Sequence, residues 1–263
     1  MIPFPNIDPV VLEIGFFQVH WYGVSYVLGI GIGWYYLENR ARASSLKVIS
    51  VSDTVFYVAL GAVVGGRIGY ILFYNLAAYY HDPLSILAIW KGGMSFHGGV
   101  LGVALVLIWQ ARKIESSVFA LSDFIVPALP IGIGLGRLAN FVNQELWGAP
   151  TDLPWGVVFT VPAAGGFSRH PTQLYEAFLE GLLLFLLLHF MSKRKLALGT
   201  TTGLFLLLYG CFRSLVELLR EPDSHIGYLY GDWLTMGQLL CAPMILIGLI
   251  IIISCYNRES AIG

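Results

Sequence analysis

The chain has 263 residues, of which 57% are apolar and only 12% are charged, and its formal net charge is −1. Soluble domains carry about 25% charged residues, so the chain has too few charged side chains to cover a water-exposed surface, and its composition excludes an ordinary soluble protein. The near-neutral charge gives no sign of a nucleic-acid partner, and the three cysteines have neither metal-ligand spacing nor the pattern of a disulfide framework.

Seven apolar segments approach the ~20 residues that a helix needs to cross a bilayer. They lie at roughly 18–37, 52–75, 94–111, 118–138, 173–191, 199–219 and 235–255. Between the fourth and fifth segments, residues 139–172 are rich in Pro and Gly and contain the β-like run "GVVFTV". We expect an all-α integral membrane protein, with one transmembrane domain over residues 1–263 and a small external cap at about 139–172.

Basic residues are concentrated in every second loop, which indicates the orientation of the spans. These loops follow the first, third and fifth segments, and their basic residues are Arg40, Arg42, Lys47, Arg112, Lys113, Lys193, Arg194 and Lys195. The other loops carry few. This bias predicts an external N-terminus, a cytoplasmic C-terminus and an odd number of spans.

The first two segments each hold a polar candidate. Tyr22 lies in the aromatic cluster "HWYGVSY", which suits an ordinary interfacial belt or a contact to a lipid head group. Arg67 lies in "VVGGRIGYILFYN", where Gly65, Gly66 and Gly69 allow a helix or a ligand to approach closely. Helix packing explains the glycines but not an arginine inside a span, so Arg67 is a candidate ligand contact.

The third segment begins near His97, in "KGGMSFHGGVLG". A lone histidine is usually a satisfied core residue. Here it lies at the outer end of a span between two glycine pairs, so it is also a candidate general base or a hydrogen-bond donor to a phosphate. His170, in the loop motif "RHPTQLYE", is a rival candidate for the base, and His20 is a weaker one.

The fourth segment ends in "GRLANFVNQELWG", where Arg137, Asn140 and Asn143 follow at spacings of three. If the helix continues, they form one polar stripe, with Glu145 positioned to orient either amide. A planar guanidinium and neutral amide donors suit phosphate binding. The alternative is a helix-capping network that binds no ligand.

The fifth and sixth segments contain the remaining charges within spans. Glu176 ends the loop motif "RHPTQLYE", and Glu180 follows it by four residues. In "YGCFRSLVELLRE", Arg213 and Glu217 share a helix face with Tyr209. This motif is equally consistent with two interpretations. Arg213 and Glu217 form a structural ion pair, or Glu217 orients Arg213 to bind an anion.

Three arginines within spans and glycine-lined gaps suggest a ligand that is both anionic and apolar, such as a phospholipid. The common catalytic patterns HExxH, GxSxG, CxxC and the P-loop do not occur. The residues alone lead no further.

Several of these stretches resemble one known family, prolipoprotein diacylglyceryl transferase. The segment "GRLANFVNQELWG" is similar to the signature of that family, and "GGRIGYILFYN", "GGMSFHGG", "HWYG", "RHPTQLYE", "YGCFRSLVELLREPD" and "TMGQLL" resemble its other stretches, in the same order. The signature positions that match are Gly136, Arg137, Ala139, Asn140, Phe141, Asn143, Glu145 and Gly148. The resemblance covers about residues 5–256, although the loop before "RHPTQLYE" is short beside those of larger members.

The resemblance implies a multi-pass protein of the bacterial cytoplasmic (inner) membrane with its active site toward the periplasm and the cap on that side. It implies transfer of the diacylglyceryl group of phosphatidylglycerol to the lipobox cysteine of a preprolipoprotein signal peptide, without a metal or cofactor. The expected catalytic residues are His97, Arg137, Glu145 and Arg213. The expected head-group contacts and supports are Tyr22, Arg67, Asn140, Asn143, Gly148, Tyr209 and Glu217.

A transporter or flippase for an anionic lipid or a small anion is the alternative from another class. Arginines on a transport path would continue toward the cytoplasmic mouth, and transporters often contain paired halves. Here the polar residues concentrate on one side and no half-repeat is evident, which favours the enzyme.

Overall fold

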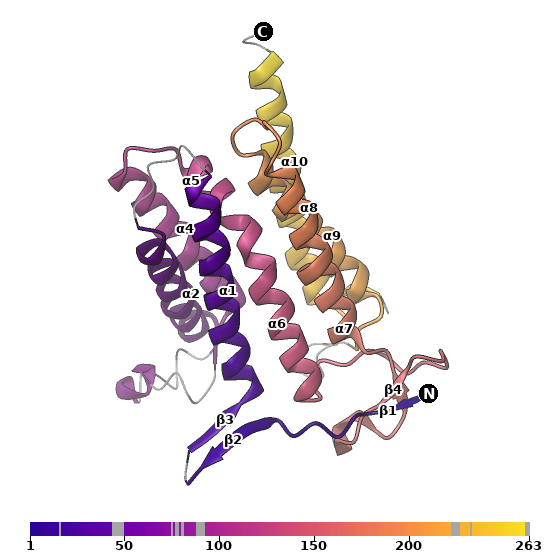
Figure 1. Ribbon diagram of the computed structural model, residues 1–263. Helices are drawn as coiled ribbons and strands as arrows, with labels where there is room; N and C mark the ends of the chain where they lie inside the picture. The colour runs from indigo at the N-terminus through magenta and orange to yellow at the C-terminus, as the bar shows by residue number, and fades with distance from the viewer. Residues whose placement is uncertain are drawn as a thin grey trace. The chain divides into compact units, whose positions relative to one another are not determined.

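The computed structural model describes residues 1–15, 17–43, 50–74, 76, 79, 82–87, 93–221, 227–231 and 233–260. The chain forms two compact units. Figure 1 labels their helices and strands. One unit combines Met1–Gly33 with Asp123–Gly263, and the other is Trp34–Ser122. A single membrane domain over the whole chain remains a prediction.

The unit Trp34–Ser122 is built on the pairing of α2 (Val51–Tyr74) with α4 (Phe96–Lys113). Glycines lie where the two helices meet. A Cβ added to Gly65 would come within 2.3 Å of the Gly98 carbonyl oxygen, so only glycine permits this approach. The short 3₁₀ helix η1 (Pro83–Leu87) lies between the two helices in the chain.

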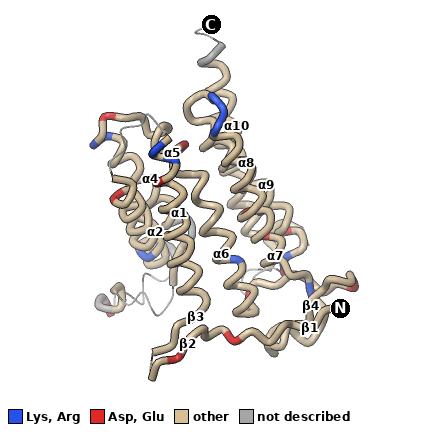
Figure 2. The backbone as a smooth tube through the Cα atoms, in the orientation of Figure 1, with Lys and Arg blue, Asp and Glu red and all other residues tan. Residues whose placement is uncertain are grey.

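The other unit contains most of the helices. In chain order these are α1 (Trp21–Arg42, to Gly33), α5 (Val118–Ile125, from Asp123), η3 (Val126–Ala128), α6 (Leu129–Val142), α7 (Thr172–Glu176), η5 (Ala177–Leu183), α8 (Leu184–Met191), α9 (Thr200–Glu217) and α10 (Met236–Ser260). The element η5 is a π-helix that joins α7 to α8 without a break. Long parts of α8, α9 and α10 carry no charged residue, as lipid or core contact requires (Figure 2).

Two small sheets accompany these helices. Strands β1 (Ile2–Pro3), β4 (Val157–Val158) and β5 (Ser168–Arg169) form a sheet in the order β1-β4-β5, with β1 parallel to β4 and β5 antiparallel to it. Strands β2 (Val10–Ile14) and β3 (Phe17–His20) form an antiparallel hairpin. The β-like run "GVVFTV" thus contains β4, whereas its pairing with the N-terminus gave no signal in the sequence.

The cap region has a small apolar core of its own. Phe4 from the N-terminal segment packs with Phe159 and Ala164, all of them buried, and Trp147 and Phe141 pack against this cluster. The cluster fixes the loop that follows α6 against the strands. This loop begins with Asn143 of the predicted polar stripe and contains Glu145.

Four helical segments of the described residues are long and apolar enough to cross a membrane. They are Val51–Leu72, Val118–Val142, Thr172–Met191 and Met236–Asn257, and they match four of the seven predicted spans. The other three predicted spans overlap α1, α4 and α9. Residues 18–20 lie in β3 rather than in a helix, residues 94–95 precede α4, and residues 218–219 follow α9. A mostly helical membrane protein is confirmed, and the count of seven remains a prediction.

Candidate functional site

Three arginines and three glutamates from four neighbouring elements form one ion-pair network. Its members are Arg137 on α6, Glu176 at the end of α7, Glu180 on η5, Arg213 and Glu217 on α9, and Arg220 after α9. The sequence singled out most of these charges but assigned no role to Glu176 or Glu180. Ion pairs between helices remote in sequence can be recognised only once the helices are packed.

Arg137 and Arg213 each meet two carboxylates. Arg137 lies 3.2 Å from Glu176 (Nε to Oε2) and donates from Nη2 to Glu180 Oε2 at 3.3 Å. Arg213 contacts Glu176 through Nη1 and lies 2.7 Å from Glu217 Oε2 through Nη2. Because both arginines are paired, neither is an isolated charge in an apolar bundle, and both guanidinium groups are held in fixed orientations.

Exposure differs sharply within the network. The side chains of Glu176 and Glu180 are fully buried, whereas 18% of the Arg137 side chain is accessible. A ligand that reaches this network from outside therefore meets the arginine before the carboxylates. This asymmetry suits an anion-binding site with its counter-ions behind it.

Glu217 is held from a further direction. Thr235, just before α10, donates its hydroxyl to Glu217 Oε1 at 2.9 Å. A Cβ added to Gly237 would lie 2.5 Å from the same oxygen, so a larger residue at the start of α10 would displace the carboxylate. The stretch "TMGQLL" thus supports the network, and neither Thr235 nor Gly237 was identified from the sequence as a site residue.

A second polar group follows directly at the end of α6. The helix ends at Val142, with Asn143 as its C-terminal cap. Arg137 and Asn140 of the predicted stripe therefore lie on the helix, and Asn143 lies at its end. Asn140 donates to Glu145 Oε1 at 2.7 Å, and Asn143 donates to the same oxygen at 3.5 Å. This arrangement fits the helix-capping alternative, with Glu145 as the acceptor that both amides share.

The loop after Asn143 is held by the residues that begin α7. Gln144 and Leu146 have φ angles of 53° and 59°, a left-handed conformation that costs non-glycine residues energy. Gln173 donates its amide to the Glu145 carbonyl at 2.5 Å, and Thr172 donates its hydroxyl to the Leu146 carbonyl at 2.9 Å. The stretch "PTQ" therefore fixes Glu145 through the backbone.

Gly148 is required by close packing. Its amide donates to the His170 carbonyl at 2.8 Å, and an added Cβ would lie 2.5 Å from the Leu219 carbonyl oxygen. Buried Arg169 donates to the Gly148 carbonyl at 3.1 Å and contacts Glu221. Gly148 thus joins the loop to the end of α9, and Arg169, treated in the sequence as part of a loop anchor, ties the cap together.

Tyr209 and Tyr22 lie in the same unit as the network. Tyr209 is buried on α9 one turn before Arg213, and its ring stacks on Phe205 with centroids 5.9 Å apart. Tyr22 begins α1, is 37% exposed, and packs edge-on against Tyr26. Tyr209 is thus next to the arginines, and Tyr22 has the exposure expected of an interfacial aromatic residue.

Arg67 and His97 belong to the unit Trp34–Ser122. Arg67 is 5% exposed and donates to the backbone carbonyls of Ser85, Ile86 and Gly93 at 2.7, 3.0 and 3.2 Å. These bonds join α2 to the segment before α4, a structural role that the sequence did not indicate. His97 lies in the first turn of α4, and its side chain falls outside the described residues.

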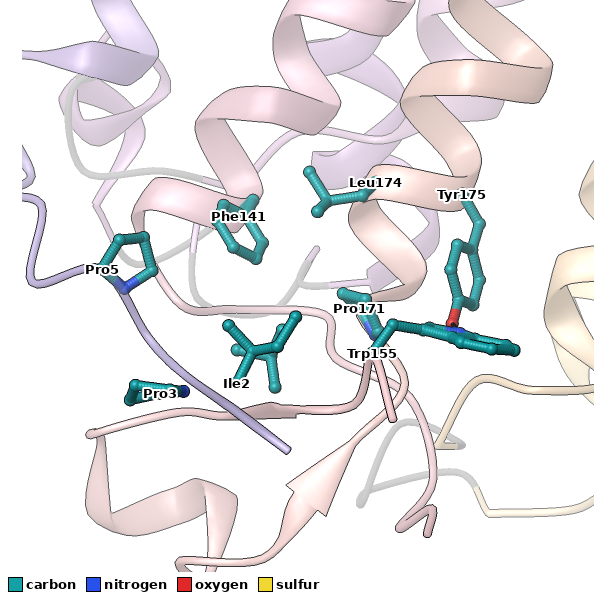
Figure 3. A pocket seen from close by; sticks show the side chains of 9 residues that line it. Ile2, Pro3, Pro5, Phe141, Trp155, Pro171, Leu174 and Tyr175 are labelled. Carbon is teal, nitrogen blue, oxygen red and sulfur yellow. Dashed lines mark hydrogen bonds between the residues drawn. The ribbon is translucent and has the colours of Figure 1, made fainter. Parts of the chain in front are cut away.

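An apolar hollow of about 380 Å³ lies beside the end of α6 and the start of α7 (Figure 3). Phe141 and Leu174 line it from the helices, and Ile2 and Pro5 line it from the N-terminal segment. Trp155 donates its indole N–H to the Tyr175 hydroxyl at 2.9 Å on its other side. The hollow has room for one apolar side chain or a short length of acyl chain.

Comparison with known proteins gives one consistent answer. A family model described as "Prolipoprotein diacylglyceryl transferase" matches residues 9–254. Relatives named phosphatidylglycerol–prolipoprotein diacylglyceryl transferase include proteins of Azotobacter vinelandii (50% identical, 100% of both chains covered), Methylococcus capsulatus (48% identical, 99% of this chain and 100% of the relative) and Pseudomonas aeruginosa (47% identical, 99% and 98%).

Proposed function

Because the chain belongs to the prolipoprotein diacylglyceryl transferase family, we propose that it transfers the diacylglyceryl group of phosphatidylglycerol to the lipobox cysteine of a preprolipoprotein. The products are a thioether-linked lipid and glycerol 1-phosphate, and the reaction is the first step of lipoprotein maturation. Relatives that carry this enzyme name match the chain over its whole length, so the transporter alternative has no support.

The paired arginines are the observation that carries this proposal. In the reaction a thiolate attacks an sp³ carbon of the lipid, a C–S bond forms, and the C–O bond to the phosphate breaks. Negative charge grows on the departing phosphate. Arg137 and Arg213, held by buried carboxylates, stabilise that charge without rearrangement during the reaction.

The amides near the arginines complete the proposed head-group site. Asn140 and Asn143 are neutral donors for the glycerol and phosphate oxygens, and Glu145 orients them. Tyr209 supports Arg137 through a side-chain hydrogen bond, Glu217 supports Arg213, and Gly148 keeps the loop in place. Tyr22 and Arg67 are retained as head-group contacts on the sequence pattern alone.

The thiol must lose its proton before it attacks, because the thiolate is the nucleophile. His97 is the proposed base, on the strength of its position between glycine pairs at the start of a span. A His97→Gln variant that lacks a base loses about 10²–10⁴ in rate. It regains activity between about pH 7 and 9, as a thiol with a pKa near 8.5 ionises unaided. A defect that stays constant over this range would leave His97 as a head-group contact.

The remaining features of the proposal concern the membrane. The proposed arrangement has seven spans, an external N-terminus and a cytoplasmic C-terminus. In this arrangement the end of α6 and the cap lie at the periplasmic face of the bacterial inner membrane. At that depth the outer leaflet presents phospholipid head groups. Two acyl chains then remain in the bilayer while the head group reaches Arg137.

Release of glycerol 1-phosphate tests the proposed function. The purified chain in phosphatidylglycerol vesicles releases glycerol 1-phosphate when a lipobox peptide is added. With the same peptide carrying serine in place of cysteine, release stays at background, because a hydroxyl of far higher pKa gives no nucleophile. Release at the same rate without the peptide would indicate a phospholipase and overturn the proposal.

A further inference from the structure

We propose that Glu176 is a positioning residue that sets the spacing of the Arg137 and Arg213 guanidinium groups for the phosphate. This inference rests on the proposed function, since it assumes that the two arginines act on one anion. Glu176 itself is fully buried and does not meet the substrate.

Among the described residues, Glu176 is the one carboxylate that pairs with both Arg137 and Arg213. Its Oε2 lies 3.2 Å from Arg137 on α6, and its Oε1 contacts Arg213 on α9. It is the last residue of α7, so one carboxylate connects three helices. Glu180 and Glu217 each meet only one of these two arginines.

The helix changes form directly after Glu176. The π-helix η5 begins at Ala177, and such turns are rare and occur frequently at functional sites. Gly181 of η5 packs on Gly134 of α6 so closely that a Cβ on Gly181 would lie 2.6 Å from the Gly134 Cα. Backbone contact between η5 and α6 therefore fixes where the Glu176 carboxylate stands relative to Arg137.

Charge and geometry can be separated at this position. The network contains three arginines and three glutamates, so it is formally neutral before an anion binds. Replacement of Glu176 by Gln removes a negative charge and keeps the length of the side chain. Replacement by Asp keeps the charge, but the side chain is one methylene shorter and cannot contact both arginines.

Binding of glycerol 1-phosphate to the full-length chain in detergent tests the spacing without any need for transfer. For Glu176→Asp we expect the dissociation constant to rise at least fivefold, because spacing is lost at constant charge. For Glu180→Gln we expect it to fall, because a negative charge is removed while the bridge remains. Glu176→Gln both loses the spacing and removes a negative charge, so its dissociation constant should stay within about threefold of that of the unaltered chain.

Turnover in phosphatidylglycerol vesicles gives the second readout. Both Glu176 variants lose at least tenfold in kcat, and Glu180→Gln keeps at least five times the kcat of Glu176→Gln. Asp123→Asn is the control for general damage, because Asp123 accepts bonds from the Gly199 and Thr202 amides at the start of α9, outside the network. It lowers the thermal midpoint without lowering kcat.

Opposite outcomes would overturn the inference. If Glu176→Asp binds and turns over like the unaltered chain, only the charge at this position matters. If Glu176→Gln and Glu180→Gln behave alike, the bridge has no special role. Absence of transfer by the unaltered chain would instead refute the proposed function. The dissociation constants of glycerol 1-phosphate for the variants would still decide the role of Glu176. If one Glu176 variant does not fold, the other and Glu180→Gln supply the comparison.

Discussion

The charges of Arg137 and Arg213 are tolerated in an apolar bundle because each guanidinium pairs with two carboxylates. Removing one partner of a buried pair typically costs ~3–5 kcal/mol, since an uncompensated charge remains in the core. Replacing a member by apolar residues would change folding and chemistry together. Substitutions that keep the charge and alter its shape are therefore the informative ones.

Arg137→Lys and Arg213→Lys are expected to insert and fold but to lose at least tenfold in kcat/KM. Arg137 reaches Glu176 and Glu180 through two different nitrogens, and a single ammonium cannot do this while it also binds a phosphate. One charge-assisted hydrogen bond is worth roughly 1.5–3 kcal/mol, which sets the tenfold limit. The measurement is phosphatidylglycerol-dependent transfer by protein matched for membrane content. Near-normal turnover in Arg137→Lys would show that a diffuse positive field is sufficient.

Ionisation of His170 makes the stability of the folded chain depend on pH. Partial burial lowers the pKa of its imidazole below the usual value of about 6.5, so the unfolded chain binds a proton more readily than the folded one. Its contribution to stability is complete above about pH 6.5 and declines as the pH falls below that value. The thermal midpoint of the unaltered chain should therefore fall more than that of His170→Gln between pH 7.5 and 5.5. Parallel curves for the two proteins would contradict the shift.

At the scale of elements, the site depends on the close approach of η5 to α6. Gly181→Ala places a methyl group 2.6 Å from the Gly134 Cα and must separate the two helices. We expect a lower thermal midpoint and at least a tenfold loss of transfer, because Arg137 is then drawn away from Glu176 and Glu180.

Gly136→Ala is the matched control for that prediction. Apart from its chain neighbours and the backbone of its own helix, a Cβ at Gly136 meets no atom of the described structure within 4 Å. Alanine also favours a helix more than glycine does. The control should keep its thermal midpoint and its activity. Equal damage from both substitutions would show that α6 is sensitive to any added methyl group and that the η5 contact is not special.

The sequence predicted where apolar helices lie better than how they end. Long apolar runs located the segments of α2, α6 and α10, because composition decides burial in lipid. The cap at Asn143 and the left-handed Leu146 depend on hydrogen bonds from Thr172 and Gln173, which no local pattern reveals. The π-turn of η5 likewise depends on tertiary contact with α6.

The candidate site was predicted as a set of residue types rather than as a set of pairs. Arg137, Arg213 and Glu217 stood out because charges are rare in spans, and the i,i+4 pair could be recognised from spacing. The bridge made by Glu176 joins residues 37 positions apart (Glu176 to Arg213), so it required the packed helices. For Arg67 the sequence suggested a ligand contact, because arginine is rare within spans. In the structure Arg67 donates hydrogen bonds to backbone carbonyls.

At the scale of the whole molecule, the basic residues predict the orientation in the membrane. Arg40 and Arg42 lie in the last turn of α1, and Arg112 and Lys113 lie in the last turn of α4, as expected for cytoplasmic ends. A reporter that is active only in the cytoplasm, fused after Cys255, should therefore be active. Activity only from a periplasmic reporter at that site would reverse the topology and put Arg137 at the wrong face.

The most direct test of the account is the mass of a lipobox peptide after incubation with the purified chain and phosphatidylglycerol vesicles. We predict a mass gain of one diacylglyceryl group on the cysteine sulfur. The gain should resist neutral hydroxylamine, which cleaves a thioester, because the bond to sulfur is a thioether. The gain should be absent with vesicles that lack phosphatidylglycerol. An unchanged peptide mass, while phosphatidylglycerol crosses the bilayer of the same vesicles, would contradict the account and identify a lipid transporter.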